Sequence, residues 1–394
     1  MPVQITGIAQ RQGNRYPLSI LIATNCLKKT DHVIELRKHP VVALTLAIFL
    51  LAGLPAANAE GIRIGFAAPL SGTFSALGNQ LAEGARVAAS VKGTELIVSD
   101  DGCDAEGGKT SAERFIREGV EVAAGFLCSD ALEAALPILA KRGIPVIASG
   151  ISEPTLLEKR AVTLLPVFRL TTGLEKETQA TGSFLASLWR AQPFAVIDDG
   201  TIEGRERAAR VLASLKEQQL QPVFTDTFRP GLDNQNALVG RLRRAGATHV
   251  YVGGERDDIA AIGASAATLN YPLVIAGGNL LNAAPGATPL STGTLMVAPL
   301  NPQDLPTAKS AIEALHQSGK LAETHSVTGY ATAQIAIDTI RQATDQKQSA
   351  VDILRSSAFE TALGTIKFDA NGMRTDNPNR LQRYDGGRFV LADK

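Results

Sequence analysis

Short apolar runs of four to eight residues alternate with amphipathic segments along most of this chain. In the first half, residues 62–67, 95–99, 120–127 and 145–148 have the length and apolar content of strands. Strands of this kind, separated by helices, are typical of parallel sheets that helices cover on both faces. The alternation therefore predicts a doubly wound α/β fold. The helices expected between these strands cover 82–90, 109–117 and 130–141.

The same alternation continues from 167–170 toward the end of the chain. Residues 60–394 exceed what a single core usually serves, so we expect two doubly wound parallel-sheet lobes. No internal repeat beyond the alternation is visible. The further helices are expected at 175–189, 205–218, 306–318 and 327–343, and the further strands at 194–197, 223–228, 249–252, 366–369, 381–384 and 388–391.

The segment 1–59 has the features of an export signal. Arg37, Lys38 and His39 precede an apolar run at 41–54, and the small residues at 57–59 have A-x-A spacing. These features predict a signal peptide, preceded by an upstream extension and cleaved after Ala59, and hence a periplasmic protein. The alternative is a membrane anchor, but the run is shorter than the roughly 20 apolar residues that cross a bilayer. The residue after the predicted cut is not a cysteine, which excludes a lipid anchor there.

Charge and cysteine usage narrow the partners and the compartment. Residues 1–59 carry six of the 39 basic side chains and two of the 39 acidic ones, which leaves a net charge of about −4 on the rest. That charge, without a basic cluster, argues against nucleic acid or an anionic membrane as a partner. Downstream of residue 59 only Cys103 and Cys128 remain, and an even pair in an oxidising compartment predicts a disulfide. The alternative is two buried free thiols.

The sequence offers no strong signature of catalysis, metal binding or a cofactor. Gly108-Lys109-Thr110 resembles part of a phosphate-binding loop, but Cys103 stands where that motif needs its first glycine. Residues 150–154 lack the second glycine of a nucleophile elbow. The five histidines are scattered without metal-ligand spacing, and His249 begins an expected strand. We therefore expect no catalytic residue, no metal and no cofactor.

The informative positions of a doubly wound sheet are the turns from strand to helix. Ligands bind there, beyond the carboxyl ends of the strands, where helix N-termini favour anions. Several such turns carry hydroxyl groups or glycine, and each by itself is no more than a good helix cap. Together they predict one binding site. The turns are 69–72, 127–130, 149–152 and 198–201.

At these turns the chain resembles the branched-chain amino acid binding family, the periplasmic components of ABC importers with the type I periplasmic binding protein fold. The similarity covers essentially all of the chain after residue 59, and the order and spacing of its motifs are more specific than any single one. The motifs are 68–72 with Gly78, 100–104, 125–129, 145–149, 198–201 with Gly204, 252–254 and 364–372.

The resemblance implies two lobes, joined by three crossings, that close over a solute. By this analogy lobe 1 is 61–172 plus 302–365, and lobe 2 is 173–301 plus 366–394. The expected function is that of a monomeric solute-binding protein that delivers an amino acid or related small polar solute to an inner-membrane ABC permease. A periplasmic receptor that docks on a signalling protein is the alternative. An exported enzyme is a third hypothesis, but Ser129 lacks an obvious general base.

The resemblance also implies which residues touch the ligand. In amino-acid-binding relatives, the positions of Ser129, the Gly150 carbonyl and Ser152 hold the α-carboxylate and the α-ammonium from lobe 1. Short hydroxyl groups and free backbone groups suit a carboxylate, and the expected helix start at Ser129 adds its dipole.

Four other ligand positions depart from the pattern of the family. Leu77 replaces a residue that is often aromatic, Glu203 and Glu255 replace tyrosines, and Asn279 replaces an acid that meets the ligand ammonium. An aliphatic ligand side chain would leave the two glutamates buried without partners, which is costly. We therefore expect a cationic or polyfunctional polar solute instead of leucine, isoleucine or valine. The alternative is that both glutamates are solvated loop residues.

Overall fold

The computed structural model describes residues 62–151 and 165–392. Its first sheet, the sheet of lobe 1, has five parallel strands in the order β2-β1-β3-β4-β5. The strands are β1 (Arg63–Ala68), β2 (Glu95–Asp100), β3 (Val122–Gly125), β4 (Val146–Ala148) and β5 (Val167–Arg169). The helices beside it are α2 (Ser75–Lys92), α3 (Ala105–Arg117), α4 (Ser129–Ala140), α10 (Lys309–Gln317), α11 (Thr324–Gln346) and α12 (Ala350–Ser356).

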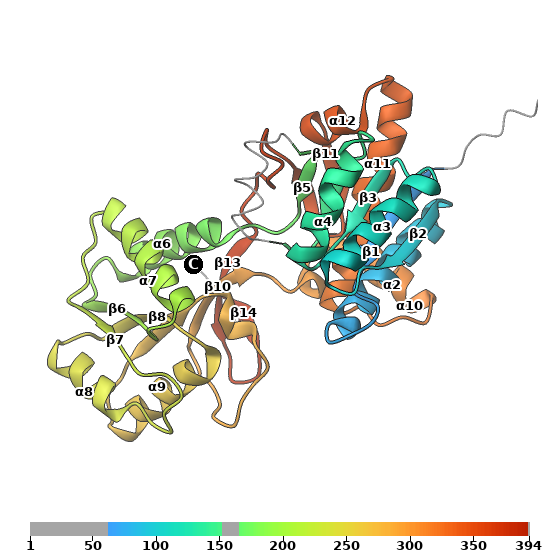
Figure 1. Ribbon diagram of the computed structural model, residues 1–394. Coiled ribbons are helices and arrows are strands. Elements are labelled where there is room, and N and C mark those ends of the chain that lie inside the picture. Colours follow the sequence, from blue (N-terminus) through green and yellow to red (C-terminus); the bar gives the residue numbers. More distant parts are fainter. Residues whose placement is uncertain (1–61, 152–164, 393–394) are drawn as a thin grey trace, which may run out of the picture. The chain divides into compact units, whose positions relative to one another are not determined.

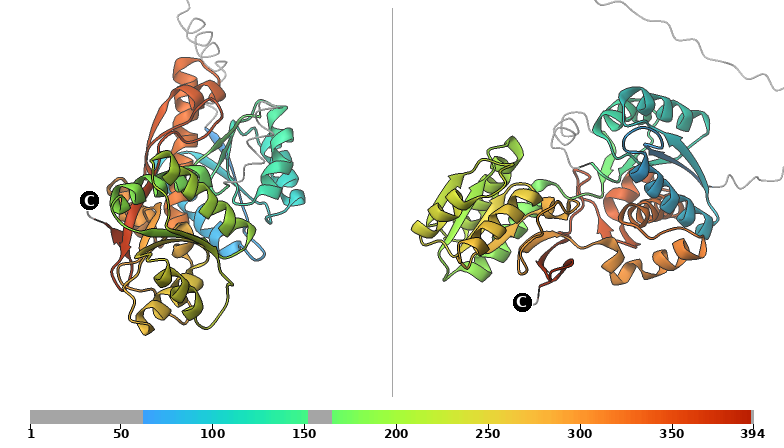
Figure 2. Two further views of the ribbon diagram at one scale, coloured as in Figure 1. Left: turned by 90° about the vertical axis from the view of Figure 1, so that its left-hand side faces the viewer. Right: turned by 90° about the horizontal axis from the view of Figure 1, so that it is seen from below.

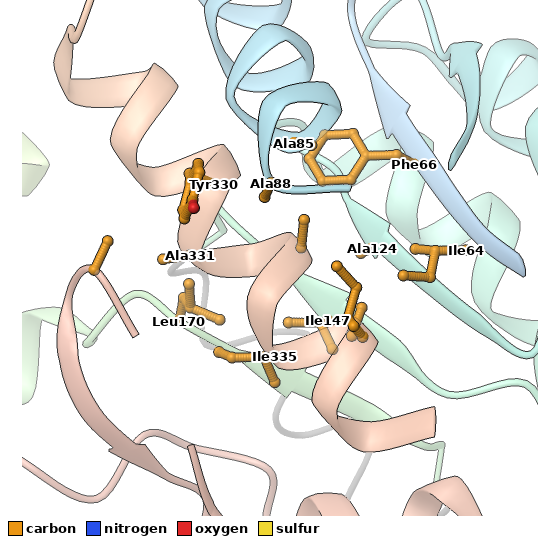
Figure 3. Packing of buried hydrophobic residues seen from close by; sticks show 14 of the residues in the cluster. Ile64, Phe66, Ala85, Ala88, Ala124, Ile147, Leu170, Tyr330, Ala331 and Ile335 are labelled. Atoms are coloured by element: carbon orange, nitrogen blue, oxygen red, sulfur yellow. The ribbon is translucent and has the colours of Figure 1, made fainter. Parts of the chain in front are cut away.

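Helices cover both faces of this sheet. Ile64 and Phe66 of β1 pack toward α2 and α11 (Figure 3). Ala67 of the same strand contributes to the core under α3 and α4. Helices α2 and α11 can approach closely because each has a glycine at the contact. A Cβ on Gly84 would lie 1.8 Å from the Ser326 carbonyl oxygen, and a Cβ on Gly329 would lie 1.9 Å from the Leu81 carbonyl oxygen. The alternation seen in the sequence therefore yields a sheet buried on both sides.

The second sheet, the sheet of lobe 2, has seven strands in the order β14-β13-β10-β9-β8-β6-β7. Strands β6 to β10 run parallel, and the C-terminal strands β13 and β14 add two antiparallel neighbours at one edge. The strands are β6 (Phe194–Asp198), β7 (Phe224–Thr227), β8 (His249–Gly253), β9 (Val274–Gly277), β10 (Leu295–Pro299), β13 (Asn379–Tyr384) and β14 (Phe389–Leu391). The helices are α6 (Leu174–Trp189), α7 (Ile202–Glu217), α8 (Asn236–Arg244), α9 (Arg256–Thr268) and the short 3₁₀ helix η1 (Asn279–Asn282).

This sheet is also covered on both faces. Phe194 and Val196 of β6 pack under α6 and α7, and Ala195 and Ile197 pack under α8 and α9. The predicted fold of two doubly wound parallel-sheet lobes is thus confirmed, with the antiparallel C-terminal pair as an addition.

The chain passes from one sheet to the other three times: between β5 and α6, after β10, and before β13. Orange and red segments therefore occur in both parts of the ribbon (Figures 1 and 2). Around the second and third crossings lie the 3₁₀ helices η2 (Pro302–Asp304) and η3 (Pro306–Ala308), and the two-stranded sheet of β11 (Ala358–Thr361) and β12 (Gly364–Lys367). Among the described residues, no helix is long and apolar enough to cross a membrane.

Candidate functional site

The turn after β1 is held by a carboxylate of the neighbouring strand. Asp100 accepts hydrogen bonds from the N–H groups of Leu70 (2.8 Å) and Gly102 (3.0 Å). Burial by itself would raise the pKa of Asp100, but hydrogen bonds from the Ser71 hydroxyl and these N–H groups bring it below its usual value. The turn that leads into α2 therefore has a fixed shape. Leu77, in the first turn of α2, has 39% of its surface exposed.

The turn after β3 is made by two consecutive residues with left-handed backbone. Gly125 has φ of 98° and Phe126 has φ of 57°, a conformation that is uncommon for a residue other than glycine. The Phe126 ring is fully buried, and its N–H donates to the Ala67 carbonyl (2.7 Å). Packing and hydrogen bonding thus hold the conformation, which sets where the next helix begins.

Helix α4 begins at Ser129, which is half-buried, and no side chain caps its N-terminus. The predicted disulfide between Cys103 and Cys128 is present, with 5.2 Å between the Cα atoms, and it ties the start of α4 to the turn after β2. A helix start without a side-chain cap leaves N–H groups available to an anion, and the helix dipole favours negative charge there.

Gly150 follows β4 and is exposed beside this helix start. Its N–H donates to the Phe126 carbonyl (3.3 Å), and the neighbouring Ser149 hydroxyl shares a buried hydrogen bond with Thr332 (2.9 Å). The structure thus brings Ser129 and Gly150 together at the carboxyl ends of β3 and β4, where the sequence predicts them. Ser152 lies outside the described residues.

In lobe 2, the turn after β6 is a compact hydrogen-bonded loop. The Asp199 carboxylate accepts from the N–H (2.9 Å) and the hydroxyl (2.7 Å) of Thr201, and the Thr201 hydroxyl accepts from the Gly204 N–H (2.9 Å). Thr201 is therefore the N-cap of α7. The cap places Glu203 in the first turn of the helix, with 55% of its side chain exposed.

Glu203 has a cationic partner that the sequence-based reasoning missed. Arg207 donates from Nε (3.1 Å) and from a terminal nitrogen (2.9 Å) to one oxygen of Glu203, and its other terminal nitrogen lies 2.5 Å from Glu177 of α6. Glu177 in turn accepts from the N–H of Asn279 (3.0 Å). A chain of hydrogen bonds and ion pairs thus joins η1, α6 and the start of α7. The spacing of Glu203 and Arg207, four residues apart, was a visible signal of the pair, whereas Glu177 is distant in sequence.

Glu255 is the N-cap residue of α9 and is exposed. It lies near the Glu203 turn because β6 and β8 are neighbours, with Asp198 opposite Gly253. Burial, followed by the charges of Glu203 and Asp199, raises the pKa of the Glu255 carboxyl. In the described residues its carboxylate makes no hydrogen bond. Glu203 is thus paired with Arg207, whereas Glu255 feels the Arg207 charge but forms no ion pair in the described structure. The expectation of a cationic solute therefore rests on Glu255 alone.

The described loops carry polar groups that suit the binding of a small solute. His249 lies at the amino end of β8, away from the loops, with its ring 5.4 Å from that of Trp189, and burial lowers its pKa. Within residues 62–151 and 165–392, no group of three His, Cys, Asp or Glu side chains is placed to hold a metal ion. A hollow of about 470 Å³ beside β6 and β7 contains none of the predicted ligand residues.

Comparison with known proteins decides the family. The sequence profile described as periplasmic binding protein matches residues 61–388. The chain belongs to this family. Among curated relatives, the Leu/Ile/Val-binding protein homolog 2 of Brucella abortus (strain 2308) is 27% identical over 325 residues, which cover 79% of this chain and 87% of the relative.

Another relative of this periplasmic binding protein is the leucine-specific-binding protein of Salmonella typhimurium, 25% identical over 353 residues, with 85% of this chain and 94% of the relative covered. A solved structure described as a putative branched-chain amino acid ABC transporter from Rhodospirillum rubrum superposes with a TM-score of 0.72 at 17% identity, over 84% of this chain and all of that one. The resemblance seen in the sequence is thereby confirmed, and so is the type I fold.

Proposed function

We propose that this protein is the periplasmic receptor of an ABC importer, and that it binds an amino acid or a related small polar solute between two lobes and delivers it to the permease. The observation that carries the proposal is the start of α4. No side chain caps this helix N-terminus, and it stands beside the exposed Gly150 at the carboxyl edge of the first sheet. The match to the periplasmic binding protein family and the amino-acid-binding names of its curated relatives support the same function.

In this proposal the two lobes hold different parts of the ligand. The ligand carboxylate meets the Ser129 hydroxyl and the first N–H groups of α4, and the α-ammonium meets the Gly150 carbonyl. Lobe 2 (173–301 and 366–394) contributes Glu203, Glu255 and Asn279 when it closes against lobe 1 (61–172 and 302–365). The ligand's contacts with both lobes provide the bias toward the closed state.

The same proposal includes export. Residues 1–59 act as an upstream extension and signal peptide, cleavage follows Ala59, and the mature protein is a monomer in the periplasm. Intact-mass analysis of protein purified from the periplasm of an expression host tests the cleavage site. A mature N-terminus at Glu60 is the expected result, and a retained apolar run 41–54 would contradict it.

Ligand binding is tested by thermal shift and calorimetry on the exported protein, with leucine, valine, glutamine, glutamate and arginine as probes. At least one α-amino acid should raise the melting temperature, because a ligand stabilises the state that it binds. Ser129→Ala should weaken the best ligand about 10-fold or more, since it loses a hydrogen bond to a charged group. Ser90→Ala, an exposed serine on α2, is the matched control. If no amino acid binds, or if Ser129→Ala binds as tightly as the wild type, the proposed site is wrong.

A further inference from the structure

Lys176 lies in the first turn of α6, directly after the first crossing between the sheets, and it is half-buried. Its ammonium group donates to three successive main-chain carbonyls of the third crossing, those of Arg374, Thr375 (2.8 Å) and Asp376 (3.0 Å). An ammonium has three N–H donors, so the three acceptors use all of its hydrogen-bonding capacity. One side chain at the end of the first crossing thus contacts three successive residues of the third.

The third crossing is also tied to α6 in the reverse direction. The side-chain amide of Asn377 donates to the Lys176 carbonyl (2.9 Å). Next to it, Arg374 forms a two-pronged ion pair with Asp376 (2.5 and 2.7 Å), which holds the carbonyls of both residues in place. Bidentate pairs of this kind are geometrically specific, so the Arg374–Asp376 pair helps to hold the carbonyls that receive Lys176.

A second tie joins the same two crossings at their other end. The Arg169 N–H, at the end of β5, donates to the Gly372 carbonyl (2.8 Å), and its guanidinium donates to the Met373 sulfur (3.0 and 3.2 Å). Arg169 and Met373 also form a parallel β-bridge. The first and third crossings are thus joined at β5 on one side and at α6 on the other.

The Lys176 ammonium is partly removed from water, unlike the ammonium of an exposed lysine on the surface. Burial lowers the pKa of Lys176, and the nearby carboxylates of Asp376 and Asp369 partly offset this effect. An ammonium removed from water is retained at low cost only where its donors are paired, and here the carbonyls provide the pairing.

We propose that Lys176 is a hinge-positioning residue, which joins the first and third crossings into one strap so that they bend together when the lobes close. The strap limits the number of open arrangements in the ligand-free protein. A restricted open state loses less conformational freedom on closing, so the tie favours ligand binding without touching the ligand. The binding part of this inference rests on the proposed function, whereas the mechanical part does not.

The experiment compares Lys176→Met with Lys216→Met, which removes an exposed lysine from α7 of the same lobe. Hydrogen exchange is measured on ligand-free protein over residues 370–380, together with the radius of gyration by X-ray scattering. Lys176→Met should speed exchange of the Thr375 amide, which donates to Lys367, by about 10-fold or more, because three charge-assisted bonds are lost. Lys176→Met should also broaden the distribution of molecular size that X-ray scattering gives. Lys216→Met should change neither the exchange rate nor this distribution.

Two further variants protect the test against misfolding. Lys176→Gln keeps two donors on a shorter side chain and should give an intermediate exchange rate, and Met373→Leu should loosen only the β5 end. Unchanged exchange and unchanged scattering in Lys176→Met would overturn the strap. For an amino acid that binds the wild type, Lys176→Met should raise Kd several-fold through the added conformational cost. If no amino acid binds, the proposed function fails, while the ligand-free measurements still decide the strap.

Discussion

Arg207 of α7 and Glu177 of α6 form an ion pair with 2.5 Å between nitrogen and oxygen, in which the two side chains are only 10% and 11% exposed. Burial has the largest effect on both groups. It raises the pKa of the Glu177 carboxyl, which the Arg207 charge only partly offsets. Burial by itself would lower the pKa of Arg207, but the Glu177 charge and the hydrogen bond to Glu203 raise it above its usual value. Because Asn279 donates to Glu177 and Arg207 donates to Glu203, this pair joins three elements, α6, α7 and η1. We expect it to be a structural centre of lobe 2.

Arg207→Met should therefore destabilise the protein strongly. The variant leaves the buried Glu177 carboxylate without its cation, and breaking a buried pair in this way costs about 3–5 kcal/mol. Urea unfolding followed by circular dichroism measures the loss. The control is Arg210→Met, on the same helix, whose pair with Glu206 is about half exposed (43% and 44%) and should be worth less than about 1 kcal/mol. Equal effects of the two variants would contradict the central role of Arg207.

Tyr251 is a buried residue whose replacement should not destabilise the protein. Its hydroxyl is fully buried and has no hydrogen-bond partner in the described structure, and burial raises its pKa. Tyr251→Phe removes an unsatisfied polar group, so the free energy of unfolding should stay the same or rise. In Tyr271→Phe, by contrast, a hydroxyl that donates to the Ala247 carbonyl (2.6 Å) is lost, which should cost about 1 kcal/mol. A clear loss of stability in Tyr251→Phe would show that its hydroxyl is paired.

The disulfide gives a third prediction. Replacing Cys103 and Cys128 together by serine opens a loop with a sequence separation of 25, and should lower the free energy of unfolding by about 3 kcal/mol. Because the bond anchors the start of α4, affinity for a carboxylate ligand should fall as well. Chemical denaturation and calorimetry on the same variant measure both effects. Wild-type affinity in a folded double variant would mean that the turn after β3 positions Ser129 without the disulfide.

Much of the fold follows from the alternation of apolar runs and helices, but its boundaries depend on backbone conformation. The run 120–127 predicts a strand to its end, whereas β3 stops at Gly125, because Gly125 and Phe126 adopt left-handed conformations. The sequence does not predict helix α9. Most of its residues are small or apolar, so the helix shows no clear polar face with a period of 3.6 residues. The predicted C-terminal strand pair is confirmed as β13 and β14.

Only part of the candidate site could be predicted from the sequence. The resemblance to the family indicates Ser129, Gly150, Glu203 and Glu255, and each of them follows the carboxyl end of a parallel strand, where a doubly wound sheet binds its ligands. The Glu177 partner of Arg207 could not be predicted, since it comes from another helix far along the chain. The acceptors of Lys176 are main-chain carbonyls, which leave no trace in residue identity.

Asp101 provides a prediction about pH. Its side chain is fully buried, one carboxylate oxygen accepts from the Cys103 N–H (3.0 Å), and the other has no partner in the described residues. Burial, together with the charges of Asp100 and Asp104, raises its pKa from 3.8 to about 6. Between pH 3.8 and about 6, Asp101 is therefore protonated in the folded protein and ionised in the unfolded chain. The contribution of Asp101 to stability is greatest below pH 4 and is lost as the pH rises through 6.

The difference in unfolding free energy between the wild type and Asp101→Asn isolates this group from the other carboxyls. As the pH rises from 4 to 8, the wild type should lose up to about 3 kcal/mol relative to the variant, since each unit of pKa shift corresponds to 1.36 kcal/mol. Urea unfolding at closely spaced pH values measures the difference, and Asp104→Asn, which replaces the N-cap of α3, serves as the comparison. A pH-independent difference for Asp101→Asn would mean that Asp101 is ionised with a near-normal pKa, and that solvent or another donor reaches its second oxygen.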